Sequence, residues 1–299
     1  MKILASLVKR NTKLFFKDKG MFFTSLITPA ILLVLYATFL GNVYRDSFMM
    51  GMPEGVTIPE KLLDGFVGGQ LFSSLLAVSC ITVAFCSNFL MVQDKVTGAR
   101  ADLTMSPVKS STLALGYYIS STIATLIVCF AATLVCFVYL AIVGWYLSVL
   151  DVALIIVDIL LVVTFGTALS SIVNMFLSSQ GQISAVGSIV SAGYGFICGA
   201  YMPISQFGNT LQKVLSFSPG TYATSLIRNH SLRGAFAEME AIGLPTEAID
   251  GVKMAIDCNV QFFGHDVSLW AMFAVLFISV AVLLAVYILL NVYRNKKKK

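Results

Sequence analysis

Charged residues are scarce in this sequence, and their scarcity argues against a water-soluble fold. They make up 12% of the 299 residues, whereas apolar residues make up 58%. A soluble domain carries about 25% charged and about 45–50% apolar residues. The excess apolar residues lie in long runs that do not alternate with polar ones, so the runs predict helices and not the strands of a barrel.

Six of these runs reach the ~20 apolar residues that a helix needs to cross ~30 Å of hydrocarbon. The predicted spans are Phe22–Leu40, Phe66–Val92, Leu113–Leu140, Val152–Leu177, Ile183–Met202 and Ser268–Leu290. The sequence therefore predicts an all-α integral membrane protein, with a six-span transmembrane domain over residues 21–299.

Residues 1–20 precede the first span and combine basic residues with leucine and phenylalanine. This mixture predicts an amphipathic helix that lies in the headgroup layer with its apolar face toward lipid. Lys9, Arg10, Lys13 and Lys17 would then contact anionic headgroups. The alternative is a charged flank without a defined helix, because the apolar periodicity is imperfect.

Most of the 20 basic residues fall into three clusters, which lie before the first span, between the second and third spans, and after the last span. With six spans, all three clusters are on one side, and the positive-inside rule makes that side cytoplasmic. We therefore expect a multi-pass protein of the cell membrane with both termini in the cytoplasm. Topology and contact with anionic lipid account for the net charge of +5, so no nucleic-acid partner is expected.

Cysteine and histidine are also few, and their positions argue against a disulfide framework or a metal centre. Five of the six cysteines lie inside predicted spans, where they act as small apolar residues, and Cys258 stands alone outside them. The two histidines, His230 and His265, are isolated and lack metal-ligand spacing. The sequence also lacks the Gly-x-x-x-x-Gly-Lys-Ser/Thr loop that cradles nucleotide phosphates, so no cofactor is expected on this chain.

The predicted fifth span carries small residues at every fourth position. Gly187, Ser191, Gly195 and Gly199 would share one helix face, and Pro203 follows the span. Such a strip lets helix backbones approach closely in lipid. It indicates either ordinary bundle packing or a helix that faces a second copy beside a substrate path.

Asp158 is the one acidic residue placed well inside a predicted span. A buried carboxylate is costly in hydrocarbon and is a functional candidate by default. We expect it near the outer boundary, where water or Tyr146 could reach it. A carrier driven by protons or sodium would show more intramembrane acids or histidines, so their scarcity favours an external energy source.

The cytoplasmic loop over residues 93–111 is short, mixed in charge, and divided by Gly98 and Pro107. A short helix is expected ahead of Pro107, and a new helix is expected to begin at Pro107, because the residue before a proline is biased away from helix. Such a loop could carry a push from a cytoplasmic partner into two spans. The alternative is a solvated connection without a mechanical role.

Two blocks of residues resemble the permeases of type-two ABC exporters. The first block is Asp94-Lys95, Gly98, Leu103 and Ser106-Pro107-Val108, and the second is Gly199-x-x-x-Pro203, Leu211-Gln212, Ser218-Pro219-x-x-Tyr222 and Arg228. Their order and the six-span layout make the resemblance extend over nearly the whole chain. The chain departs from the family pattern after Gly98, where Ala99 and Arg100 replace the usual Thr and Glu.

The resemblance implies an assembly with a second permease copy or a homologous permease and with two cytoplasmic ABC ATPase subunits, which would hold ATP and Mg. It implies re-entrant outer helices in the external region over residues 203–267. It also implies that the loop contacts the ATPase through Asp94, Lys95, Gly98, Asp102, Leu103, Ser106 and Pro107.

The function expected on these grounds is ATP-driven export of an amphipathic substrate, which could be a drug, a peptide, a lipid or a lipid-linked glycan. The chain itself is then not an enzyme. An ion-coupled secondary transporter is the main alternative. A membrane-embedded enzyme acting on lipid is a further alternative, for which His230, His265 and Asp266 are the candidate residues.

Overall fold

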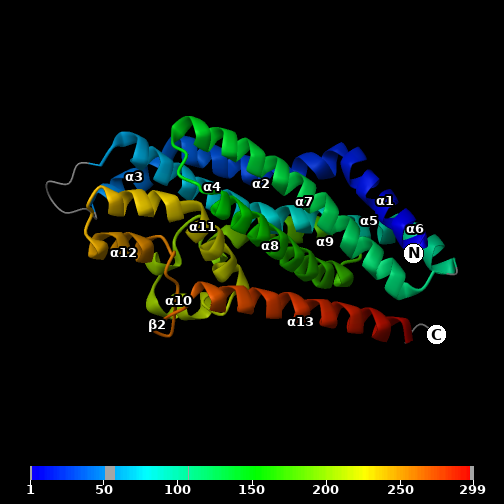
Figure 1. The fold of residues 1–299 in the computed structure, drawn as a ribbon. Coiled ribbons are helices and arrows are strands. Elements are labelled where there is room, and N and C mark those ends of the chain that lie inside the picture. Colours follow the sequence, from blue (N-terminus) through cyan, green and yellow to red (C-terminus); the bar gives the residue numbers. More distant parts are fainter. Residues whose placement is uncertain (1, 51–57, 107, 297–299) are drawn as a thin grey trace.

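The computed structural model describes residues 2–50, 58–106 and 108–296, which form an elongated bundle of helices (Figure 1). The elements in chain order are α1 (Lys2–Lys17), α2 (Lys19–Leu35), the π-helical turn η1 (Tyr36–Leu40), α3 (Gly41–Met50), α4 (Glu60–Asn88), α5 (Leu90–Val96), α6 (Ala99–Met105), α7 (Ser110–Val143), α8 (Val149–Phe176), α9 (Gln180–Ile197), the 3-10 turn η2 (Ile204–Gln206), α10 (Asn209–Leu215), α11 (Pro219–Ala241), α12 (Thr246–Ala255), β1 (Gln261–Phe262), β2 (His265–Asp266) and α13 (Leu269–Lys296). In the described residues the only strands, β1 and β2, pair antiparallel as one short hairpin. The predicted all-α fold is confirmed.

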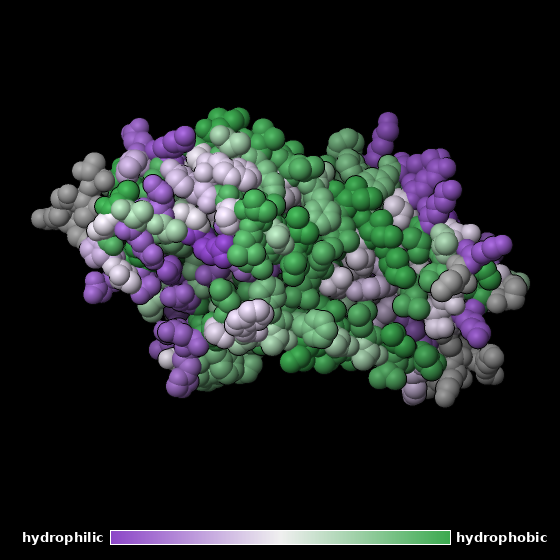
Figure 2. All heavy atoms as spheres, viewed as in Figure 1, coloured by the Kyte–Doolittle hydropathy of each residue, from purple (hydrophilic) through white to green (hydrophobic). Residues whose placement is uncertain are grey.

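Five helical stretches are long and apolar enough to cross a membrane. They are Lys19–Asp46, Glu60–Val96, Ser110–Val143, Val149–Phe176 and Leu269–Tyr293, and they correspond to the first four predicted spans and the last one. Figure 2 shows an apolar band around the middle of the bundle between two hydrophilic ends. Both termini lie at one end in Figure 1, which we call the near end, and α3, α12 and the hairpin lie at the other, the far end.

The predicted fifth span is the exception. It corresponds to α9, which is 18 residues long, opens with Gln180, Gly181 and Gln182, and is rich in glycine and serine. These polar and small residues make α9 less apolar than the five stretches above. Length and composition therefore support five spans and leave the sixth unconfirmed.

Helices at the far end run beyond the predicted spans. The helix of the first predicted span continues past Leu40 into α3, which ends at Met50, and α4 begins at Glu60. The connection between the first two predicted spans is therefore helical over much of the part that the structure describes. A helix satisfies its own backbone hydrogen bonds wherever it runs, so polar residues beyond the hydrocarbon do not end it.

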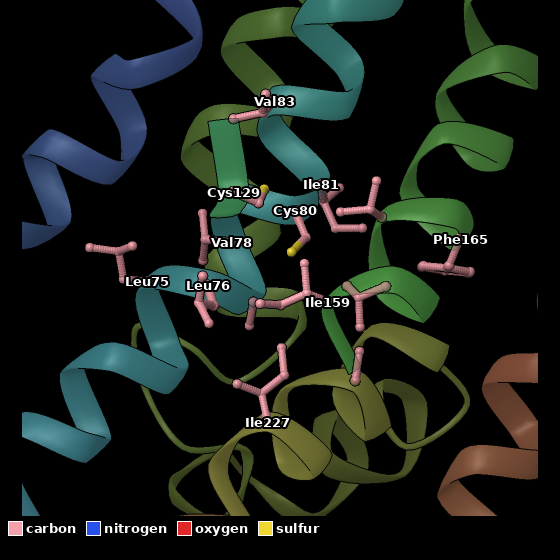
Figure 3. Packing of buried hydrophobic residues seen from close by; sticks show 14 of the residues in the cluster. Leu75, Leu76, Val78, Cys80, Ile81, Val83, Cys129, Ile159, Phe165 and Ile227 are labelled. Atoms are coloured by element: carbon pink, nitrogen blue, oxygen red, sulfur yellow. The ribbon is translucent and has the colours of Figure 1, made fainter. Parts of the chain in front are cut away.

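The centre of the bundle is α4. Every residue from 65 to 88 is buried, and α2, α7, α8, α9 and α11 all pack against this helix. Figure 3 shows Cys80 of α4 beside Cys129 of α7, with Ile159 of α8 and Ile227 of α11 in the same cluster. A helix that is apolar on all faces is one that is buried on all faces, and α4 accordingly carries apolar residues on every face, while its polar ones over residues 65 to 88 are uncharged.

The helix at the amino terminus packs on protein along one face. Leu7 is buried and lies over Gly116 of α7, where an added Cβ would come within 3.2 Å of the Leu7 Cβ. Lys9, Lys13 and Lys17 are exposed on the other faces. The expected contact of the apolar face with lipid is therefore replaced, in part, by contact with α7, because glycine at 116 lets the two helices approach closely.

A very close backbone approach occurs at the far end, where α11 passes the loop between α7 and α8. A Cβ added to Gly234 would lie 1.6 Å from the carbonyl oxygen of Tyr146. A backbone carbonyl cannot rotate away as a flexible side chain can, so only glycine fits here without a shift of the helix.

We therefore predict that Gly234→Ala destabilises the protein by about 1–3 kcal/mol or more, the usual cost of overpacking. Gly251→Ala is the matched control, because Gly251 is also helical and has no atom within 4 Å of an added Cβ. Thermal unfolding of the two purified variants in detergent compares them directly. The close approach would be refuted if both variants unfolded at the temperature of the parent protein.

Candidate functional site

The loop at the near end turns sharply between two short helices. α5 ends at Val96, and Gly98 adopts a left-handed conformation with φ of +83° before α6 begins. Glycine adopts this conformation without the steric penalty that a Cβ brings. None of the residues of α6, all of which the structure describes, is buried, and Met105 is 86% exposed. The loop therefore presents a largely exposed helix at the near end.

Asp94 fixes the base of this loop to two other helices. Its side chain is buried, and its carboxylate accepts hydrogen bonds from Arg10 Nη1 at 2.7 Å, Arg10 Nη2 at 3.0 Å and the Tyr117 hydroxyl at 2.6 Å. A two-pronged contact between guanidinium and carboxylate is directional as well as strong. The bonded carboxylate raises the pKa of Arg10 above its ordinary value, so Arg10 keeps its charge, and these contacts join α5 to α1 and α7.

Lys95 fixes the same base to a third helix. Its ammonium donates to the backbone carbonyls of Asn174 at 3.0 Å, Met175 at 2.8 Å and Leu177 at 2.7 Å. α8 ends at Phe176, and the last carbonyls of a helix lack partners within the helix. A cation here also balances the negative end of the helix dipole. Lys95 thus holds the carboxyl end of α8 against the loop.

The other predicted contact residues of the loop divide between exposed and half-buried positions. Gly98 and Asp102 are exposed, whereas Leu103 is half-buried against a cluster that includes Leu7. Ser106 donates its hydroxyl to the Leu103 carbonyl at 2.7 Å.

Pro107 lies outside the described residues. The prediction that a helix begins there is wrong, because α7 begins at Ser110. The chain is extended at Ser106 and Lys109 instead, so Lys109 becomes the N-cap.

Sequence reasoning missed two of the partners that hold this base. Arg10 was expected to contact lipid headgroups, and Tyr117 was not identified at all. Both are far from Asp94 in the sequence, by 84 and 23 residues. The only available signal was that Arg10 is an arginine among lysines, and arginine is the residue suited to paired contacts with a carboxylate.

A cavity of about 540 Å³ lies above this base, between α2, α9 and the junction of α4 with α5. Its wall mixes apolar, hydroxyl and amide side chains: Met21, Thr24, Ile27, Phe89, Gln93, Ile183, Ser184, Ser188 and Ser191 are among the lining residues. A second cavity of about 330 Å³, rich in aromatic residues, lies toward the far end between α3, α4 and α12. Cavities of this size and lining are typical of sites for amphipathic small molecules.

The predicted strip of small residues faces its own chain. Gly187 lies against the Phe89 ring, and a Cβ on Gly195 would lie 2.4 Å from the ring of Tyr201. Gly199 does not belong to the strip, because α9 ends at Ile197 and Gly199 has a φ of +74°.

The neighbouring small residues of α9, Ser184, Ser188 and Ala192, are the exposed ones. Pro203 is buried just beyond the helix, at the start of η2.

Two acid–base pairs at the far end were not anticipated. Asp158 is fully buried, and its Oδ2 lies 2.6 Å from Nδ1 of His230 on α11. The expectation that Asp158 is reached by water or Tyr146, and that His230 is isolated, is therefore wrong. Closer to the far end, Asp151 of α8 forms an ion pair of 2.6 Å with Arg233 of α11. His265 lies exposed on β2, so the three residues considered for an enzyme do not form one cluster.

Arg228 joins the end of α9 to the outer helices. It is fully buried on α11 and donates to the Gly199 carbonyl at 3.0 Å, to the Ile256 carbonyl and to Ser74 of α4. The carboxylate of Asp257 accepts amide hydrogens from the η2 turn nearby. Burial raises the pKa of Asp257, and the charge of Arg228 opposes that rise.

The sequence that forms both ends was compared with known protein families. The family model of the ABC-2 type transporter matches residues 3–230, a range that holds the loop, its partners, the cavity beside α9 and Arg228. No curated protein matches the chain. The family match covers more than half of the sequence and agrees with the membrane-spanning helices. The chain therefore belongs to the ABC-2 type transporter family, as a multi-pass permease component.

Proposed function

We propose that this chain is the transmembrane permease subunit of an ATP-driven exporter. ATP and Mg would be held by separate cytoplasmic ABC ATPase subunits. The observation that carries the proposal is the exposed helix α6 on a base of ionic and hydrogen-bonded contacts at the near end. We place the protein in the cell membrane with this end in the cytoplasm, because the basic clusters gather here.

The surface proposed for ATPase docking consists of Val96, Gly98, Asp102 and Met105, and we call it the docking surface. Val96 is 48% exposed and Met105 is 86% exposed. Two apolar side chains this exposed beside a charged one are available for a contact with another protein. The carboxylate of Asp102 offers an ion pair to a basic residue of the partner.

Movement of the docking surface would reach three helices at once. Asp94 transmits it to α1 and α7, and Lys95 transmits it to the end of α8. ATP binding can shift the bundle between two arrangements only if the ATPase contacts them differently. The exposed loop could make such different contacts with the ATPase, and its bonds to three helices would carry the difference into the bundle.

We further propose that α9 is the sixth span and lies at the contact with a second permease copy or a homologous permease. Its 18 residues extend about 27 Å at 1.5 Å per residue, close to the ~30 Å of the hydrocarbon. The exposed small residues Ser184, Ser188 and Ala192 would let another helix approach closely. The outer helices after α9 would then be the re-entrant elements of the leaflet at the far end.

The cavity between α2 and α9 is the proposed entry to the translocation path. Its mixture of apolar and hydroxyl-bearing side chains suits an amphipathic substrate, whether drug, peptide, lipid or lipid-linked glycan. The aromatic cavity near α12 would follow it toward the far side.

The buried pair of Asp158 and His230 is the specific observation that favours an ion-coupled secondary transporter instead, because such pairs serve as proton relays. Purified protein in liposomes separates the two functions. Export that needs the ATPase and ATP and is unaffected by a proton ionophore supports our proposal. Export by the chain alone, driven by a pH gradient, would establish the alternative.

We predict that Gly98→Val weakens binding of the ATPase subunits in a pull-down. Valine at a left-handed position costs about 1–2 kcal/mol, and relief of this strain would redirect α6. Gly243→Val is the control, because Gly243 also has positive φ and open space around its Cα but lies at the far end. Equal ATPase recovery from both variants would locate the docking surface elsewhere.

We also predict that Arg10→Gln lowers the amount of substrate exported per ATP hydrolysed. The change leaves the buried Asp94 carboxylate without its charged partner and should cost about 1–3 kcal/mol of stability, toward the lower end because the Arg10 side chain is 33% exposed. Lys9→Gln is the control, since Lys9 is exposed.

The double variant Arg10→Gln with Asp94→Asn should recover part of the lost stability, because it removes the unpaired charge. Wild-type export per ATP in the Arg10→Gln variant would show that this ion pair has no part in coupling.

A further inference from the structure

A third cavity, of about 390 Å³, lies at the far end among α8, α11, α12 and α13. None of these helices lines the cavity between α2 and α9, so the two are separate. Its walls differ in character: α11 and α12 contribute all the charged groups and the imidazole of His230, together with Phe236 and Ala237, whereas α8 and α13 contribute aliphatic and aromatic side chains, including Phe273. The charged residues are Arg233, Glu240 and Lys253, so they gather on one side of the cavity.

The polar groups are ordered by depth, because α11 runs alongside α8. Arg233 pairs with Asp151, two residues into α8, and His230 pairs with Asp158, nine residues in. Glu240 lies further along α11, toward the far end. From the outside inward, the cavity therefore presents a carboxylate, then two cations, then an imidazole.

The cations retain hydrogen-bonding capacity for a ligand. Arg233 lies with Nε 2.6 Å from Asp151 in an ion pair and donates Nη2 to Ser148, which leaves most of its five N–H donors free in its 47% exposed side chain. Lys253 lies 3.7 Å from Asp250 and 5.2 Å from the Phe236 ring centroid, and neither contact uses all three of its donors.

The imidazole of His230 is fixed in orientation and has one ring nitrogen left for a ligand. His230 is 4% exposed, stacks on Phe273 at 5.9 Å, and is bound through Nδ1 to Asp158. Its Nε2 makes no hydrogen bond with any described part of the chain. Because His230 lines the cavity, this ring nitrogen is available to a polar group of a ligand.

The apolar side lies at the depth where lipid chains begin. Leu154 is five residues into α8 and Phe273 four residues into α13, about 8 Å and 6 Å along their helices. The polar layer of each leaflet is about 5–8 Å thick. Trp270, 83% exposed in the first turn of α13, is a residue type enriched at this boundary.

We propose that this cavity binds one zwitterionic phospholipid that carries a primary ammonium. The order of groups matches such a lipid: ammonium at Glu240, phosphate at Arg233 and Lys253, the glycerol ester region at His230, and chains along Leu154 and Phe273. Glu240 favours a zwitterionic headgroup over an anionic one, because its carboxylate lines the cavity and can bind an ammonium. The other two carboxylates, Asp151 and Asp158, already face Arg233 and His230. The site does not depend on the proposed export function.

The test titrates the full chain in detergent with phosphatidylethanolamine and phosphatidylglycerol of equal chain length and measures retained lipid by native mass spectrometry. We expect phosphatidylethanolamine to bind about tenfold more tightly, the size of one charge-assisted hydrogen bond. Glu240→Gln should abolish or reverse this preference. Glu238→Gln is the matched control, because Glu238 is an exposed acid on the same helix that does not line the cavity.

Lys253→Gln should weaken both lipids about tenfold, since it removes a phosphate contact. Soluble phosphoethanolamine should bind far more weakly than the lipid, because it lacks the chains. Equal affinities for the two lipids in the parent protein would overturn the proposal, as would a Glu240→Gln variant that behaves like Glu238→Gln. Equal binding of phosphoethanolamine and lipid would overturn the membrane as the source of the ligand.

Discussion

The carboxylate of Asp94 is the contact on which the near end of the protein depends. It is buried in α5, which continues α4 at the near end of the bundle, and its hydrogen-bond partners among the described residues, Arg10 and Tyr117, belong to two other helices. A buried carboxylate without such partners is strongly destabilising. The position of α1 against the bundle and the position of the exposed loop are therefore set by the same group, so neither can move alone.

The far end is organised in the same way with different residues. Buried carboxylates lie beside nitrogen-bearing side chains of another helix, with Asp158 against His230 and Asp151 against Arg233, while Arg228 donates to backbone carbonyls and to Ser74. These contacts join α11 to α4, α8 and the end of α9. The hydrocarbon-spanning middle contains mostly apolar packing around α4, so directional contacts concentrate at the two ends, where orientation matters for binding partners or ligands.

Much of the architecture could be predicted from the sequence, because span length and charge placement are local properties. The spans at Phe22, Leu113, Val152 and Ser268 were recognised by apolar length alone. Pairings could not be predicted in this way: Asp158 and His230 are 72 residues apart, and only the register between two packed helices brings them together. The strip of small residues was misassigned at Gly199 because the periodicity continues past the residue at which the helix ends.

Lys95 has a consequence for how the chain is made. Its three acceptor carbonyls belong to residues 174, 175 and 177, which leave the ribosome after α7, with the end of α8. The loop around Lys95 therefore cannot reach its final form until the fourth span has been inserted. Since the chain is made from the amino terminus, a nascent chain that ends before α8 is complete lacks the acceptors of Lys95, and the base of the loop takes its final form only after α8 has been made.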